Sequence, residues 1–71
     1  MGRPPPITNR VRELREASAM SQAALGEAIG VTRQTIIAIE QGRYSPSLES
    51  AFRIARQFAV GVEDAFGWEE A

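Results

Sequence analysis

The sequence predicts an all-α domain of five short helices. Two observations indicate this: apolar residues recur at helical spacing from residue 11 onward, and no segment alternates apolar and polar residues as a half-buried strand would. Serine, threonine and glycine also stand between the apolar stretches, where helices begin and end. A chain of 71 residues is expected to form one domain.

The first eight residues are expected to form an extended arm, 1–8, that precedes the domain. Pro4–Pro6 restrict the backbone to extended conformations and prevent a helix from starting before Ile7. The domain itself is then expected over residues 9–66.

Capping and breaking residues divide the domain into helices. The predicted helices span residues 9–18, 22–29, 32–41, 48–58 and 62–66. Their side-chain caps are Thr8 or Asn9 for the first helix, then Ser21, Thr32 and Ser47. Gly30 and Gly42 are expected to end the second and third helices, because glycine adopts a positive φ at low cost.

The apolar residues at helical spacing are expected to face a common core. They are Val11, Leu14, Leu25, Ala28, Ile29, Val31, Ile36, Ile39, Leu48, Ala51, Phe52, Ala55 and Phe58. So small a core stabilises a fold by only about 3–5 kcal/mol, so the domain needs further support. The chain has no cysteine and no histidine, which excludes disulfides and the usual zinc ligands and leaves dimerisation.

Four residues near the C-terminus are the candidate dimer interface: Val60, Val62, Phe66 and Trp68. A monomer of this size has few places to bury both aromatic rings, and a second copy would cover them, with Phe58 contributing in part. The alternative is that both rings fold back onto the first helix and complete the monomer core. Residues 67–71 form an acidic C-terminal tail that is expected to contribute to this interface.

Charge is unevenly distributed along the chain, although the net charge is only −1. Residues 1–43 carry six arginines and four glutamates, whereas residues 44–71 carry two arginines and five acidic residues. The first part is therefore basic, as a nucleic-acid-binding surface requires, and the second is acidic. All eight basic residues are arginine, which suits bidentate contacts to guanine and phosphate.

Composition argues against several classes of protein. We expect no enzyme, because cysteine, histidine, lysine and a glycine-rich phosphate loop are missing, and the acidic pairs Glu63–Asp64 and Glu69–Glu70 are interpreted as solvated charges. No apolar run approaches the ~20 residues of a membrane span, and the N-terminus lacks the apolar stretch of a signal peptide. A cytoplasmic protein without a cofactor, metal or small-molecule ligand is therefore expected.

The segment 22–41 is the most informative part of the sequence. Two helical patterns meet at Gly30, and Gly26 stands inside the first, where glycine costs about 1 kcal/mol relative to alanine. That cost is explained if the second helix crosses too closely to admit a side chain. The second pattern opens with hydrogen-bonding side chains: Thr32, Arg33, Gln34 and Thr35. Because a helix in the major groove presents its first turn to base edges, the segment predicts a DNA-binding helix-turn-helix.

With these residues the chain resembles the phage-repressor-like helix-turn-helix family (Cro-like, XRE). The matching segments are Arg-Val-Arg-Glu-Leu-Arg-Glu (10–16), Met-Ser-Gln (20–22), Arg-Gln-Thr-Ile (33–36), Ile-Glu-Gln-Gly-Arg-Tyr-Ser-Pro-Ser-Leu (39–48) and Ile-Ala-Arg-Gln-Phe (54–58). The resemblance implies a five-helix lambda-repressor-like DNA-binding domain with the helix-turn-helix formed by helices 2 and 3. It also implies a homodimer that binds an operator in adjacent major grooves, as in compact members without a ligand domain.

The resemblance assigns roles to individual residues. It implies base reading by Arg33, Gln34 and Thr35 and phosphate binding by Gln22, Thr32, Gln41, Arg43 and Tyr44. Ile37, on the same helix, is a further candidate base reader. An arginine suits guanine O6 and N7, and a glutamine suits adenine N6 and N7. Arg15 and Glu40 match an ion pair that joins the first and third helices in the family, so we assign them to structure.

Two positions of the third helix depart from the family pattern. Ile37 stands where a small or polar residue is common, and Ala38 is shorter than the polar residue often found there. Apolar contact with thymine methyl groups is therefore expected at one end of the half-site. The alternative for Ile37 is partial burial under a neighbouring loop.

The remaining arginines are interpreted as surface residues. Arg10 and Arg12 are expected to be solvated or paired with Glu13 and Glu16, and Arg53 and Arg56 to pair with acids of the tail. Arg3 is interpreted as part of a disordered terminus, with an arm that reaches DNA as the alternative.

The predicted function is a sequence-specific transcriptional regulator, a repressor, that binds a palindromic operator as a homodimer through the recognition helix 32–41. Its expected partners are double-stranded DNA and a second copy of the chain. The same domain also suits an antitoxin or a restriction-system controller. A different class of function, a protein-interaction adaptor that has lost DNA affinity, is favoured by the net charge of −1.

Overall fold

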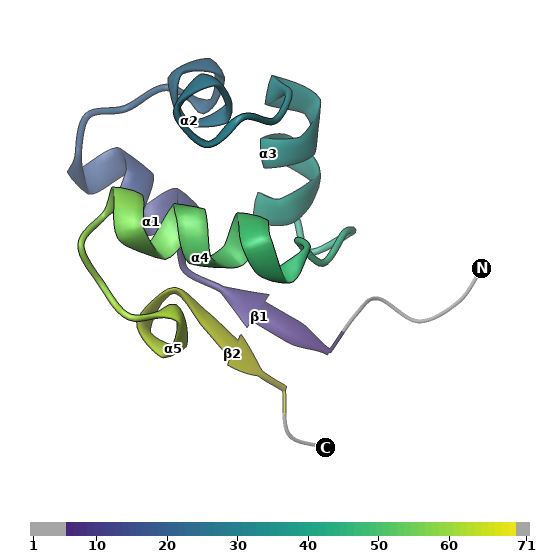
Figure 1. The fold of residues 1–71 in the computed structure, drawn as a ribbon. Helices are drawn as coiled ribbons and strands as arrows, with labels where there is room; N and C mark the ends of the chain where they lie inside the picture. Colours follow the sequence, from purple (N-terminus) through teal and green to yellow (C-terminus); the bar gives the residue numbers. More distant parts are fainter. Residues whose placement is uncertain (1–5, 70–71) are drawn as a thin grey trace.

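The computed structural model describes residues 6–69, which form five helices and two short strands (Figure 1). The helices are α1 (Val11–Ala17), α2 (Gln22–Ile29), α3 (Arg33–Glu40), α4 (Leu48–Gln57) and α5 (Val62–Ala65). The strands are β1 (Ile7–Asn9) and β2 (Phe66–Trp68). The predicted five-helix fold class is therefore confirmed. The expectations for Arg3, Pro4, Pro5 and Glu70 concern residues outside the described range.

Three of the predicted helix caps are confirmed. The hydroxyl oxygen of Ser21 accepts a hydrogen bond from the Ala24 amide at 3.0 Å, and that of Thr32 accepts one from the Thr35 amide at 3.1 Å. Ser47 caps α4 in the same way. Each cap satisfies one amide that has no partner inside its own helix, and such a cap stabilises a helix by about 1 kcal/mol.

The expectation of no strand is wrong. β1 and β2 pair in antiparallel register, with Asn9 opposite Phe66, and the Glu69 amide donates to the Pro6 carbonyl at 2.7 Å beyond the paired residues. Three residues are too few to show alternation, and the partner strand lies at the other end of the sequence. From Pro6 onward, the segment expected to be an extended arm is thus joined to the C-terminal segment (Figure 1).

The strand pairing also moves the start of the first helix from residue 9 to Val11. Asn9 still satisfies the end of this helix, because its Oδ1 accepts from the Val11 amide at 3.0 Å. Its Nδ2 donates to the Ile39 carbonyl at 2.9 Å. Asn9 therefore links β1 to both α1 and α3.

The buried core is formed by residues from four helices: Val11, Leu25, Ile29, Ile36, Ile39 and Ile54. The prediction for α4 is partly wrong, because Leu48 and Phe52 are 74% and 51% exposed, whereas Ile54 is fully buried. Ala28 is also exposed. The apolar stripe of α4 is wider than its contact with the core, which centres on Ala51, Ile54 and Ala55.

Gly26 lies at the crossing of α2 with the turn that precedes α3. A Cβ at this position would stand 2.8 Å from the carbonyl oxygen of Val31 and 3.2 Å from that of Thr32. The close approach expected from the sequence is therefore confirmed. Gly30 ends α2 with a φ of 84°, a conformation that favours glycine.

Candidate nucleic-acid interface

The amino end of α3 lies on the molecular surface. Thr32 caps the helix, and Arg33 and Gln34 in its first turn are both exposed. Ile36 and Ile39 on the opposite side of the helix are buried and hold it against the core. Arg33 and Gln34 are therefore accessible to a ligand that approaches this end of α3.

The outward face of α3 includes a residue that was not among the predicted base readers. Ala38 follows Gln34 by four residues, which places both on one side of the helix. Together with Thr35 and Tyr44 these residues line a shallow, mainly apolar hollow of about 220 Å³. The sequence already associates Ala38, together with Ile37, with apolar contact at one end of the half-site. Ile37 is half-buried.

The hydroxyl groups of Thr32 and Thr35 are hydrogen-bonded to each other at 3.0 Å. Thr32 also accepts the Thr35 amide as the cap of α3. Both hydroxyl oxygens are thus already engaged at the start of the helix. The bond between the two hydroxyl groups uses only one of their two protons, so the other proton remains available as a donor.

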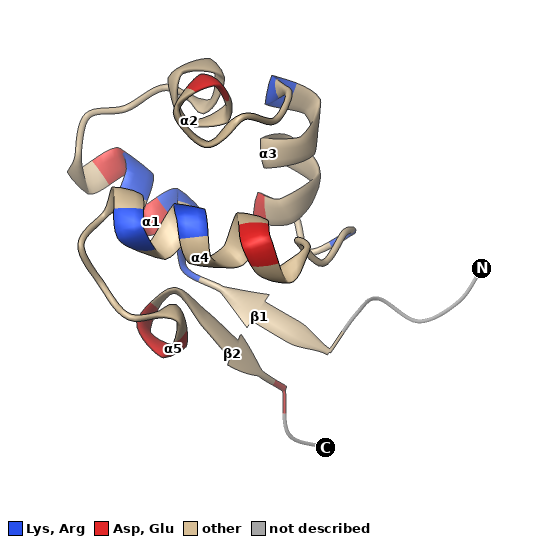
Figure 2. Cartoon of the chain, viewed as in Figure 1, with Lys and Arg blue, Asp and Glu red and all other residues tan. Residues whose placement is uncertain are grey.

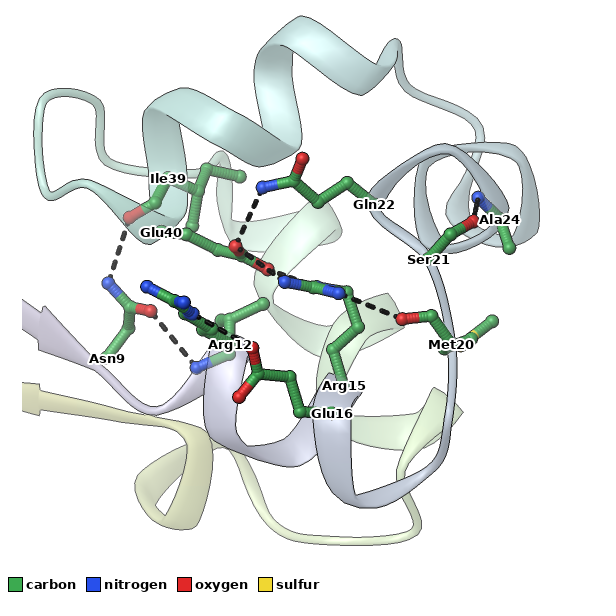
Figure 3. Close-up of polar contacts among 11 residues, drawn as sticks. Asn9, Arg12, Arg15, Glu16, Met20, Ser21, Gln22, Ala24, Ile39 and Glu40 are labelled. Carbon is green, nitrogen blue, oxygen red and sulfur yellow. Dashed lines mark hydrogen bonds and ion pairs between the residues drawn. The ribbon is translucent and has the colours of Figure 1, made fainter.

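Beneath this surface, Arg15 of α1 and Glu40 of α3 form a bidentate ion pair (Figure 3). The Arg15 Nε–Glu40 Oε2 distance is 2.6 Å, and the two side chains are only 11% and 4% exposed. The hydrogen bond to Glu40 raises the pKa of Arg15 above its already high usual value, although burial opposes this shift. The structure thus brings together the two residues assigned to a structural pair.

The ion pair also holds Gln22, the first residue of α2. Its Nε2 donates to Glu40 Oε1 at 3.1 Å, while Arg15 Nη1 donates to the Met20 carbonyl at 2.9 Å (Figure 3). One carboxylate therefore ties together α1, α2 and α3. A carboxamide nitrogen carries two protons, so Gln22 has a second donor available after this bond.

A larger hollow opens in front of this network, between α1, α2 and α3. It has a volume of about 520 Å³ and is lined by Arg12, Arg15, Ser21, Gln22, Ala23, Arg33, Glu40 and Gln41. It brings together the predicted phosphate-binding residues Gln22 and Gln41 with Arg33. The amides of Gln22 and Ala23 are at the start of α2, where helical amides lack partners and favour an anion.

The other predicted phosphate-binding residues lie just beyond α3. Arg43 Nε donates to the side chain of Gln41 at 2.8 Å, and Tyr44 is 49% exposed. Tyr44 belongs to the apolar hollow rather than to the larger one. Among the predicted contact residues, Gln22, Arg33 and Gln41 line the larger hollow and Gln34, Thr35 and Tyr44 line the apolar one. Thr32, Ile37 and Arg43 line neither of these two hollows.

Figure 2 shows arginine at the start of α3 and acidic residues in α5. On α1, Arg10 pairs with Glu13 and Arg12 with Glu16, as expected. The expectation for Arg53 is wrong, because it pairs at 2.6 Å with Glu49 in its own helix rather than with the tail. A partner four residues away is within reach on the same helix face.

A second exposed surface is apolar and includes α4, α5 and β2. Its most exposed side chains are Leu48, Phe52 and Trp68, the last 64% exposed. Beside them is an apolar hollow of about 340 Å³ lined by Ile7, Ser45, Pro46, Leu48, Ala51, Val62 and Phe66. Of the predicted interface residues, Val60 and Val62 are half-buried, and Phe66 packs against the core. The two aromatic rings thus differ, because Phe66 contributes to the monomer core and Trp68 remains exposed.

Among residues 6–69, no helix has the length and apolar character that spanning a membrane requires.

The turn at Gly30, the buried face of α3 and the exposed amino end of α3 together define a helix-turn-helix DNA-binding domain. A helix-turn-helix family model matches residues 11–64, and the chain belongs to this family.

Relatives over nearly the whole chain are transcriptional regulators rather than enzymes. The uncharacterized HTH-type transcriptional regulator YgzD of Bacillus subtilis is 52% identical over 64 residues, which cover 90% of this chain and 97% of YgzD. An uncharacterized HTH-type regulator of Methanothermobacter thermautotrophicus is 54% identical over 63 residues, 84% of this chain and 88% of the relative. The fold is also similar to that of the P22 c2 repressor, solved in complex with a synthetic operator, with a TM-score of 0.74 and 26% identity. That match covers 76% of this chain and 82% of the repressor. The chain is accordingly a helix-turn-helix transcriptional regulator.

Proposed function

We propose that this regulator is a cytoplasmic repressor that binds a palindromic operator as a homodimer. The single observation that supports this best is the exposed amino end of α3 beside the hollow that contains Gln22. A helix presented in this way can enter the major groove while the start of α2 contacts the backbone. The similarity to a repressor solved with its operator supports the same docking.

In this proposal the first turns of α3 read bases. Arg33 donates to guanine O6 and N7, and Gln34 contacts adenine N6 and N7. The hollow around Ala38, with the methyl group of Thr35 and the ring of Tyr44, accepts the 5-methyl group of a thymine. Ile37, which is half-buried and does not line this hollow, adds apolar contact at one end of the half-site.

Phosphates are held by residues around these base readers: Gln22, Thr32, Gln41, Arg43 and Tyr44. Gln22 is well suited because Glu40 orients its carboxamide and leaves one donor available. Arg43 supplies a charge directly after α3 and is linked to Gln41 by a hydrogen bond. Contacts of this kind set the register on the duplex but carry no sequence information.

A second copy of the chain covers the apolar surface. Leu48, Phe52 and Trp68 are its most exposed side chains, and Val62 and Phe66 line the apolar hollow. Val60, which is half-buried and precedes α5, contributes as well. Large exposed apolar side chains that lie close together mark interaction sites in small proteins. The two recognition helices of the dimer would then lie about 34 Å apart, one turn of DNA.

Selection of bound fragments from a random duplex pool tests the proposal. We expect enrichment of an inverted repeat whose half-site centres lie about 34 Å apart. A salt titration on the selected duplex should then show affinity falling steeply, with a log–log slope that reflects several released counterions.

One observation favours a protein-interaction adaptor instead, namely the net charge of −1. An adaptor would enrich no sequence and would not bind duplex DNA even at low salt. That outcome would refute the operator proposal, since a phosphate-binding surface has its greatest affinity under those conditions.

A further inference from the structure

Arg12 lies on the wall of the large hollow between α1, α2 and α3, together with Gln22 and Arg33. From the sequence, Arg12 is expected to be a solvated or paired surface residue, like Arg10. In the structure, the two arginines line different hollows. Arg10 borders a different hollow, whose other residues include Glu63 and Asp64.

Arg12 contributes much of the positive charge of the large hollow. The ionisable residues that line it are Arg12, Arg15, Arg33 and Glu40. Arg15 and Glu40 neutralise each other in their buried ion pair. The net positive charge of the lining therefore comes from Arg12 and Arg33, and a concave surface of one charge sign concentrates oppositely charged groups.

The present partner of Arg12 leaves most of its guanidinium available. Glu16 accepts only the Nε proton, at 3.0 Å, and the two side chains are 72% and 56% exposed. Arginine precedes glutamate in this i, i+4 pair, which is the less favourable order on a helix. An exposed ion pair of this kind contributes little to stability. An anion in the hollow can therefore displace the Glu16 carboxylate from the guanidinium or share the guanidinium with it.

We propose that Arg12 is a further phosphate-binding residue, whose guanidinium holds the DNA backbone phosphate that Gln22 contacts. Guanidinium and carboxamide then approach the phosphate from α1 and α2, while Arg33 continues from the same hollow to the bases. This inference rests on the proposed function. It adds the first helix to the DNA-binding surface.

Salt dependence of binding to a labelled random-sequence duplex tests the proposal, and Arg10→Ala is the matched control for Arg12→Ala. Both changes remove one positive charge near the start of α1, and both break an exposed ion pair with a glutamate on that helix. Each phosphate contact contributes about 0.9 to the log–log slope. Between about 50 and 200 mM salt, the affinity of the wild type should therefore fall about 3.5-fold more per protomer than that of Arg12→Ala. The slope of Arg10→Ala should equal that of the wild type.

Two further variants separate a phosphate contact from a structural effect. Arg12→Lys keeps the charge and should restore most of the slope, and Glu16→Gln removes the competing carboxylate and should tighten binding. Thermal unfolding followed by circular dichroism should show all four variants folded. Equal slopes for Arg12→Ala and Arg10→Ala would overturn the role of Arg12 and leave DNA binding intact. Absence of duplex binding by the wild type at low salt would overturn the proposed function itself.

Discussion

Replacement of Glu40 by glutamine is expected to destabilise the fold by about 3–5 kcal/mol, the cost of removing one partner of a buried ion pair. Glu40 accepts two hydrogen bonds from Arg15 and one from Gln22, and its side chain is only 4% exposed. Glutamine keeps the shape of the side chain, so no cavity adds to the effect. The cost arises because Arg15, itself 11% exposed, keeps its charge without a counter-charge.

This magnitude is comparable with the whole stability expected of so small a core, about 3–5 kcal/mol. Glu40→Gln should therefore be largely unfolded at low protein concentration without DNA. Urea denaturation followed by circular dichroism measures the difference. Glu16→Gln is the control, because it breaks an exposed pair and should cost about 0.5 kcal/mol or less.

The pH dependence follows from the raised pKa of Arg15. A raised pKa in the folded state stabilises the fold at every pH below the usual arginine pKa, and this contribution is lost only as the pH rises through the folded-state pKa. The difference between wild type and Glu40→Gln should thus be equal at about pH 7 and about pH 10. A midpoint for Glu40→Gln that matches the midpoint of Glu16→Gln would refute the assignment of the ion pair to structure.

Three other predictions concern separate parts of the molecule. Arg33→Ala should cost about 1–3 kcal/mol of binding and relax one base preference, whereas Arg43→Ala should weaken all sequences alike; identical profiles in a binding selection would contradict this division. Gly26→Ala should destabilise the fold by about 1–3 kcal/mol in urea, because its Cβ would stand 2.8 Å from a carbonyl oxygen, and an unchanged midpoint would disprove the tight crossing. The double variant Leu48→Asp, Phe52→Asp should sediment in analytical ultracentrifugation with half the mass of the wild type. Its monomer should stay folded, because both side chains are mostly exposed. An unchanged mass would exclude this surface as the dimer interface.

The helix-turn-helix could be predicted from sequence because its determinants are local. Ser21 and Thr32 each cap a helix through an amide three residues away, and Gly30 adopts the positive φ expected of a helix end. The close contact at Gly26 could be predicted for the same reason. Glycine inside a helix costs stability, and the segment that approaches it closely follows only a few residues later in the chain. The accessibility of Arg33 and Gln34 followed from the positions of Ile36 and Ile39 on the opposite side of α3.

The apolar pattern of α4 did not predict correctly which of its residues are buried. Its stripe predicted burial of Leu48 and Phe52, and the structure buries Ile54 instead. When the apolar stripe of a helix is wider than its contact with the core, either edge of the stripe can be buried. The packing of the neighbouring helices decides which edge that is. The same limitation applies to Ala38: the sequence predicts an apolar contact there, but the hollow that Ala38 lines depends on Tyr44 beyond the end of α3.

Sequence alone therefore determined the order of the helices, the side-chain caps of α2, α3 and α4 and the residues at the start of α3, because each depends on interactions within one or two helical turns. Only the tertiary structure paired Asn9 with Phe66, exposed the apolar surface of α4 and placed Arg12 and Gln22 on the walls of one hollow. These features join segments that are distant in the chain. Local propensities carry no information about such contacts, which arise from how the helices pack.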